Sequence, residues 1–153
     1  MTADLSFLER RTQERLNRLC RWYIRVAFLY LVLGMVLGVG MLAFGNDNFQ
    51  FVHVHMLLVG FVLFLIYGIG YKLIPTMFFG LPRVENIGWA EAQFWLANIG
   101  LVGMLVGAVL PVGLGLDGIA LSSGAIEAAA GILFVWLMGK TIREEPPRVA
   151  MSK

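Results

Sequence analysis

Four long runs without charge are the feature that most constrains this chain of 153 residues. Three of them hold no Asp, Glu, Lys or Arg, and the fourth holds only Glu127: Val26 to Asn46, Phe51 to Tyr71, Ala92 to Leu116 and Gly118 to Gly139. A helix rises about 1.5 Å per residue, so roughly 20 residues cross a hydrocarbon core about 30 Å thick. The sequence therefore predicts four transmembrane helices, because an open sheet cannot pair its backbone groups in lipid.

Composition excludes most other classes of protein. Hydrophobic residues make up 59% of the chain and charged residues 14%, whereas soluble domains carry about 25% charged residues. So much apolar surface also excludes intrinsic disorder. The single cysteine, Cys20, excludes a disulfide scaffold and a CxxC metal site. The basic residues gather at particular points along the chain, so no nucleic-acid partner is expected.

The expected architecture is an all-α, up-down bundle of four transmembrane helices, because short loops connect antiparallel helices. The spans are predicted at about 24–45, 51–74, 91–112 and 118–140. Before them, residues 1–22 predict an amphipathic helix that lies on the cytoplasmic face, with leucines such as Leu16 and Leu19 on one stripe and arginines near anionic headgroups. Residues 141–153 form a cytoplasmic tail.

Charge predicts the orientation of the bundle. Six arginines precede the first span, two basic residues flank the second loop, and four follow the last span. The first and third loops carry only Asp47 and Asp117. Because positive residues stay on the cytoplasmic side, both termini are expected there, in a bacterial inner membrane.

Two histidines near the outer end of the second span are candidate ligands. His53 and His55 lie about 200° apart around a helix, so they cannot bind one metal from one face. The face of His53 continues through small and aromatic residues that suit a protein interior: Gly60, Phe64, Tyr67, Gly68 and Tyr71. The face of His55 continues through aliphatic residues that suit lipid: Val59, Val62, Ile66, Ile69 and Leu73. This contrast favours His53 as a ligand, and the alternative for either histidine is a neutral imidazole bonded to a carbonyl or to water.

Glu127 is the third ionisable group inside a predicted span. Small residues surround it, so its carboxyl is expected to face the bundle or a subunit contact, protonated and hydrogen-bonded. Its partner would be a group such as Asn98 on the third span. The alternatives are proton transfer or a role beside a cofactor.

Three stretches carry a family resemblance: His53 to Phe61, Tyr67 to Pro75 and Ala92 to Gly100. Together they resemble the second and third helices of subunit I of the haem-copper oxidase superfamily, and its short relatives labelled cytochrome c oxidase subunit I-like. The resemblance covers roughly residues 50–108. It implies that His53 or His55 ligates the iron of a haem b.

The chain departs from that family in what it lacks. The second haem ligand and the copper-binding histidines come from later helices of the family, so a complete oxidase is not expected here. A two-fold homodimer would supply one histidine from each copy to a single iron. The resemblance thus implies a homo-oligomeric haem protein for electron transfer or diatomic-gas binding, with a redox partner. Two alternatives remain: a non-catalytic subunit or assembly partner of a larger membrane complex, and a small proton channel or transporter that uses Glu127 and the histidines.

Overall fold

In the computed structural model every regular element is a helix within the described residues, which are 2–80, 82, 84, 86–110 and 117–143, with side chains from residue 10 and without that of residue 117. In chain order the elements are α1 (Thr2–Phe44), the 3-10 turn η1 (Asp47–Phe49), α2 (Gln50–His55), η2 (Met56–Leu63), α3 (Phe64–Phe79), α4 (Ile87–Val109) and α5 (Asp117–Arg143). The segment η2 is a π-helix, and it joins α2 and α3 into one rod. The expectation of an all-α fold is therefore confirmed.

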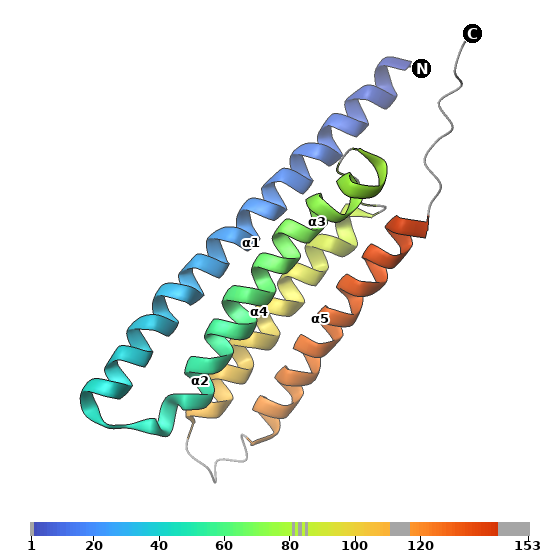
Figure 1. The fold of residues 1–153 in the computed structure, drawn as a ribbon. Coiled ribbons are helices and arrows are strands. Elements are labelled where there is room, and N and C mark those ends of the chain that lie inside the picture. Colours follow the sequence, from blue (N-terminus) through green and yellow to red (C-terminus); the bar gives the residue numbers. More distant parts are fainter. Residues whose placement is uncertain (1, 81, 83, 85, 111–116, 144–153) are drawn as a thin grey trace.

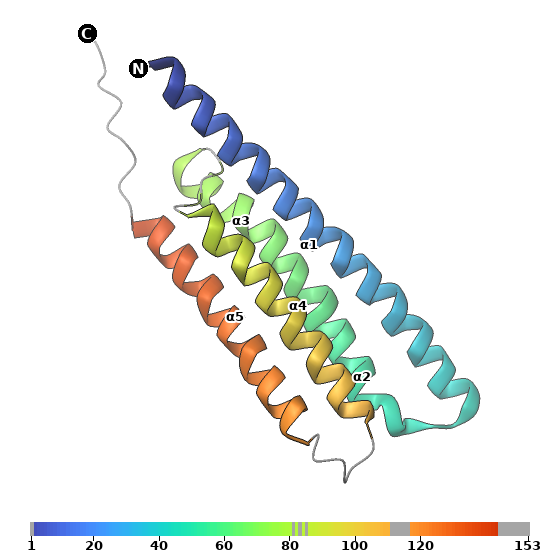
Figure 2. The ribbon, with the colours of Figure 1, turned by 180° about the vertical axis from the view of Figure 1, so that it is seen from behind.

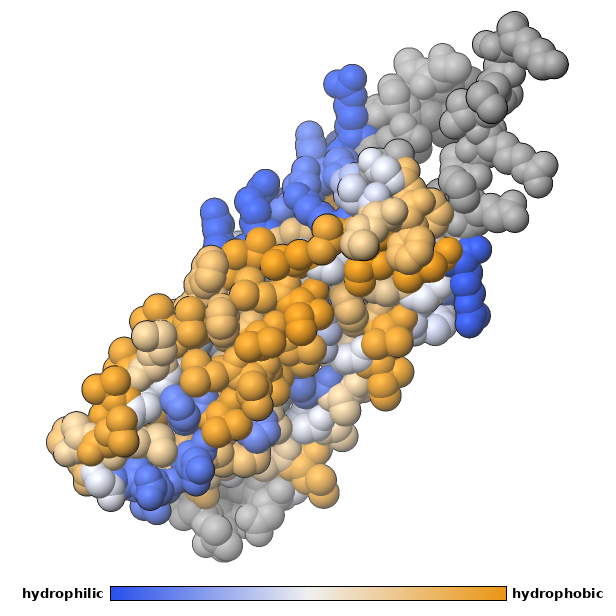
Figure 3. All heavy atoms as spheres, viewed as in Figure 1, coloured by the Kyte–Doolittle hydropathy of each residue, from blue (hydrophilic) through white to orange (hydrophobic). Residues whose placement is uncertain are grey.

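Within the described residues, four rods are long and apolar enough to cross a membrane: residues 10–44, 47–79, 87–109 and 118–143. The start of α1 and the end of α5 lie at the same end of the bundle, which we call the termini end, and η1 lies at the opposite end, the η1 end (Figure 1). Apolar side chains cover most of the face in Figure 3, and hydrophilic side chains gather toward the two ends. The assignment of the termini end to the cytoplasm stays a prediction.

The four rods form two tight pairs. One pair is α1 with η2 and α3, the other is α4 with α5, and the pairs meet where α3 packs on α5 and where α1 and α2 pack on α4. Figures 1 and 2 show α3 and α4 between α1 and α5, with α3 in front of α4 in Figure 1 and behind it in Figure 2. The order around the bundle is therefore α1–α3–α5–α4. The consecutive helices α3 and α4 are not among the closely packed pairs of the described chain, although a short loop joins them.

The expected N-terminal helix is not a separate element. The helix α1 runs unbroken from Thr2 to Phe44, since no Gly or Pro interrupts residues 2–33. Leu16 and Leu19, expected on a membrane-facing stripe, are 1% and 4% exposed because they pack in the core of the bundle. The structure therefore does not divide a surface helix from the first span at residue 22.

The helix ends follow local signals. Gly80 has φ +73°, and its N–H donates to the carbonyl of Thr76, which closes α3. The Oδ1 atom of Asn86 accepts from the N–H groups of Gly88 and Trp89 and caps the start of α4. The loop between α4 and α5, and residues 144–153 of the expected tail, lie outside the described residues.

Candidate functional site

His53 lies at the η1 end in a cradle formed by two glycines of α1. Its Nδ1 atom is 2.8 Å from the carbonyl oxygen of Gly34, and a Cβ atom added to Gly38 would lie 2.6 Å from its Cε1 atom. We call these three residues the histidine cradle. Because a carbonyl only accepts, Nδ1 carries the proton and donates it, and the Nε2 atom of the neutral ring keeps its lone pair.

His55 makes a different, local contact. Its Nδ1 atom lies 2.8 Å from the carbonyl oxygen of Phe51, one turn back on the same helix, and the centroids of the two rings are 3.9 Å apart. The predicted contrast between the two faces is confirmed. The residues that continue the face of His53 are buried, and most of those that continue the face of His55 are exposed.

The π-helical segment η2 follows the histidines directly. Its i to i+5 turns are wider than those of an α-helix, and such segments are frequent at functional sites. Gly60 of this segment is where α1 comes closest, because a Cβ atom there would lie 2.5 Å from the Cγ atom of Tyr30. The rod that carries His53 is thus held against α1 by glycines on both partners.

A second cluster lies in the centre of the bundle, and we call it the polar core: Tyr23 of α1, Tyr67 and Tyr71 of α3, Gln93 of α4 and Glu127 of α5. The hydroxyl groups of Tyr23 and Tyr71 both donate to the Oε1 atom of Gln93, the latter at 3.2 Å. These bonds link α1, α3 and α4, and the side chains of Tyr23, Tyr71 and Gln93 are fully buried. The aromatic rings of Phe64, Phe94 and Phe134 pack edge-on or tilted around the tyrosines.

Four atoms of the polar core have no hydrogen-bond partner: Tyr67 Oη, Gln93 Nε2, and both carboxyl oxygens of Glu127. An unsatisfied buried polar group costs about 1–3 kcal/mol, and more when it is charged. Buried groups of this kind are normally satisfied by an ordered water or a ligand. The polar core therefore contains four polar atoms to which the protein itself supplies no hydrogen-bond partner.

The expected hydrogen bond between Glu127 and Asn98 is not formed. The Nδ2 atom of Asn98 donates instead to the carbonyl of Phe94, 2.8 Å away on its own helix. The physical reason is the register of α4 on α5. Gly100 is the residue of α4 that abuts Glu127, since a Cβ atom there would lie 2.7 Å from the Glu127 backbone nitrogen, and Asn98 lies about 200° away around α4.

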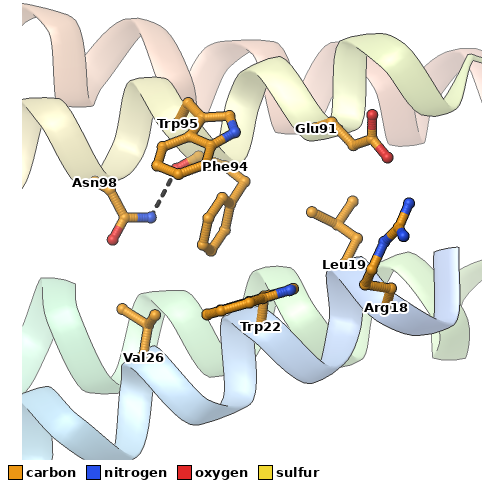
Figure 4. A pocket seen from close by; sticks show the side chains of 8 residues that line it. All are labelled: Arg18, Leu19, Trp22, Val26, Glu91, Phe94, Trp95 and Asn98. Atoms are coloured by element: carbon orange, nitrogen blue, oxygen red, sulfur yellow. Dashed lines mark hydrogen bonds between the residues drawn. The ribbon is translucent and has the colours of Figure 1, made fainter. Parts of the chain in front are cut away.

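Asn98 instead lines a groove of about 350 Å³ between α1 and α4 (Figure 4). Figure 4 shows side chains of the two helices facing each other across it: Arg18, Leu19, Trp22 and Val26 from α1, and Glu91, Phe94, Trp95 and Asn98 from α4. Next to the groove, Arg15 pairs with Glu91 through two contacts of 2.5 and 3.1 Å. This ion pair ties α1 to α4 near the termini end.

The described residues contain no group of three His, Cys, Asp or Glu side chains that could hold a metal ion. A site built from protein ligands alone is therefore not formed in this part of the chain. What the histidine cradle offers is a single nitrogen ligand.

The structure groups the predicted site residues in a way that the sequence did not. Tyr67, Tyr71 and Glu127 belong to the polar core, whereas His53 and His55 lie toward the η1 end. Sequence reasoning missed Tyr23 and Gln93, the donor and acceptor that join α1 to α4. A usable signal was present, because an amide and several tyrosines inside apolar helices need partners on other helices.

No family model matches the sequence, and no curated protein matches it either. The resemblance to the haem-copper oxidase superfamily therefore rests on the residues quoted for it.

Proposed function

We propose that this protein is an integral membrane protein of a bacterial inner membrane that binds a b-type haem between two copies of the chain through His53. Both termini would lie in the cytoplasm, with the arginines at the start of α1 close to anionic headgroups. The haem would serve electron transfer or the binding of a diatomic gas, together with a redox partner or within a larger membrane complex.

The observation that carries this proposal is the hydrogen bond from His53 Nδ1 to the Gly34 carbonyl oxygen. Histidines that ligate a metal usually donate their other ring N–H to a carbonyl or carboxylate, which fixes the ring and the tautomer. The remaining nitrogen, Nε2, is the neutral imidazole donor that haem iron accepts. His55 bonds only within its own helix, so its ring orientation depends on α2 alone.

His53 of one chain would supply one nitrogen ligand to a haem iron. A second copy related by a two-fold axis would present the same histidine and complete the pair. Exposed apolar side chains of α2, Phe51 and Val54, would border the ring system. The amide side chains of Asn48 and Gln50, exposed at the η1 end, would donate hydrogen bonds to its carboxylates. When bound, the haem supplies one-electron redox chemistry or an iron site for a gas, while the cradle holds the imidazole in place.

An optical spectrum of the detergent-purified protein, supplemented with haem, tests the proposal. We expect a Soret band at one haem per two chains, lost in His53→Ala and retained in the matched control His55→Ala. Gly38→Leu should also reduce haem binding, because the leucine side chain occupies the place of the His53 ring.

Absence of the band in the wild-type protein, or a band unchanged in His53→Ala, contradicts haem binding at the cradle. A band lost only in His55→Ala would transfer the role to that histidine and refute the assignment to His53. A colourless protein that co-purifies with larger subunits in fixed ratio would instead support a non-catalytic bundle within a membrane complex.

A further inference from the structure

The unpaired groups of the polar core carry an inference that is independent of haem. Gln93 is fully buried, Tyr67 is 1% exposed and Glu127 is 8% exposed, yet each keeps at least one polar atom without a partner. They come from α4, α3 and α5, so three helices direct unused hydrogen-bonding groups into one interior. Polar groups on a surface bond to water, whereas these groups are buried and keep atoms without a partner.

Two close helix contacts relate the carboxyl to the tyrosine. The backbone of Glu127 abuts Gly100 of α4, and the hydroxyl of Tyr67 lies 3.2 Å from the position a Cβ atom would take on Gly131. Glu127 and Gly131 are four residues apart, so they lie on the same face of α5, one turn from each other. The Tyr67 hydroxyl therefore lies about one helical turn from Glu127, toward the termini end.

No lysine or arginine in the described part of the chain forms an ion pair with Glu127. Three tyrosines lie within electrostatic reach of its carboxyl: Tyr23 and Tyr30 of α1, and Tyr67 of α3. The contact on α4 is Gly100, which carries no side chain. In such an apolar setting a carboxyl group is held as the neutral acid far more readily than as the anion.

Polar side chains also lie between this carboxyl and the termini end. Tyr71 follows Tyr67 by one turn of α3, and its hydroxyl donates to Gln93. Gln93 lies in the second turn of α4, which begins at the termini end, and it also accepts from Tyr23. On the other side, toward the η1 end, the neighbouring polar residue of α5 is Ser123, which packs against Gly103 of α4.

We propose that the polar core is a proton-binding site in which Glu127 carries the exchangeable proton and Tyr67, with intervening water, passes it to and from the termini end. In uptake, a hydronium ion from that end gives a proton to the Tyr67 oxygen while the Tyr67 hydroxyl proton moves through water to the Glu127 carboxylate. The products are neutral Glu127, an unchanged tyrosine and a water molecule. Gln93 would position the water through its unpaired Nε2 atom, while Tyr23 and Tyr71 hold its Oε1 atom in place.

Infrared spectroscopy of the full-length, haem-free protein in liposomes tests this site directly. We expect a carbonyl stretching band of a protonated carboxyl group in apolar surroundings that changes amplitude with pH and shifts in D₂O. Glu127→Gln should abolish the band, while Glu14→Gln, a change at an exposed carboxyl of α1, should leave it intact. A hydrophobic carbodiimide should label residue 127 in the wild-type protein, and the label should be identified by peptide mass.

Tyr67→Phe separates the route from the site. This variant removes one hydroxyl and should slow deuterium exchange of the Glu127 band at least several-fold without abolishing the band. Circular dichroism and thermal melting should verify the fold of Tyr67→Phe and Glu127→Gln. A band that persists in Glu127→Gln, or the absence of any pH-sensitive buried carboxyl band, overturns the site. Exchange that is equally fast in Tyr67→Phe overturns the route. None of these outcomes depends on whether the cradle binds haem.

Discussion

At the η1 end, both histidines of α2 are paired with backbone carbonyls, His53 across helices and His55 within its own helix. In the polar core, by contrast, side chains pair with one another and four atoms are left over. Helical carbonyls are available everywhere along a bundle, so an imidazole on a glycine-lined contact finds one easily. Buried hydroxyl, amide and carboxyl groups between large aromatic rings have only one another as potential hydrogen-bond partners. The first arrangement orients a group, and the second leaves four buried polar atoms without a partner in the protein.

The largest effect is expected from removing Gln93, the hydrogen-bond acceptor of the polar core. Gln93→Leu leaves the hydroxyls of Tyr23 and Tyr71 buried without a partner, at about 1–3 kcal/mol each, and the loss of the unpaired Nε2 atom offsets part of that. We expect unfolding in mixed micelles to become easier by about 2–4 kcal/mol.

Asn98→Leu is the matched control, because that amide bonds only to a carbonyl of its own helix and is half-buried. Its effect should stay below about 1 kcal/mol. Equal losses of unfolding free energy in the two variants would mean that the Gln93 amide, which links helices, contributes no more to stability than the Asn98 amide, which does not.

A second test compares glycines at helix contacts. Gly100→Ala places a methyl group against the backbone of α5, which cannot move like a side chain, so the free energy of unfolding should fall by about 1–3 kcal/mol. Gly40→Ala on α1 meets nothing within 4 Å and should stabilise the helix by up to about 1 kcal/mol. Melting of the two variants in the same detergent measures the difference, and a neutral Gly100→Ala would contradict the tight packing of α4 on α5.

The smallest expected effect concerns the ion pair between α1 and α4. The side chains of Arg15 and Glu91 are 44% and 31% exposed, and exposed pairs contribute about 0–1 kcal/mol. Arg15→Gln should therefore change the melting temperature little, and the change should shrink further at high salt. A large, salt-independent loss would show that Arg15 contributes to the bundle by packing and not by charge.

Much of this fold was predictable from local pattern. The uncharged runs predicted four helical rods, and the burial of the His53 face and exposure of the His55 face followed from helical periodicity. The boundary expected near residue 22 was not found, since a change in composition does not end a helix that lacks a breaker. The site was only partly predictable. Glu127 and Tyr67 were recognised as unusual, but the partner Asn98 was wrong, because partner choice depends on how α4 is rotated against α5.

The sequence by itself determined how many helices this protein has, how long they are, and which faces are apolar, because these properties depend on neighbours three or four residues away. The tertiary structure alone decided that α3 and α4 lie across the bundle from each other, that Tyr23 and Tyr71 meet Gln93, and that the Glu127 carboxyl has no partner. Those outcomes depend on the rotation and axial shift of whole helices. Glycines such as Gly100 lie at these contacts, but which residues of the partner helix they meet is decided only when the helices pack.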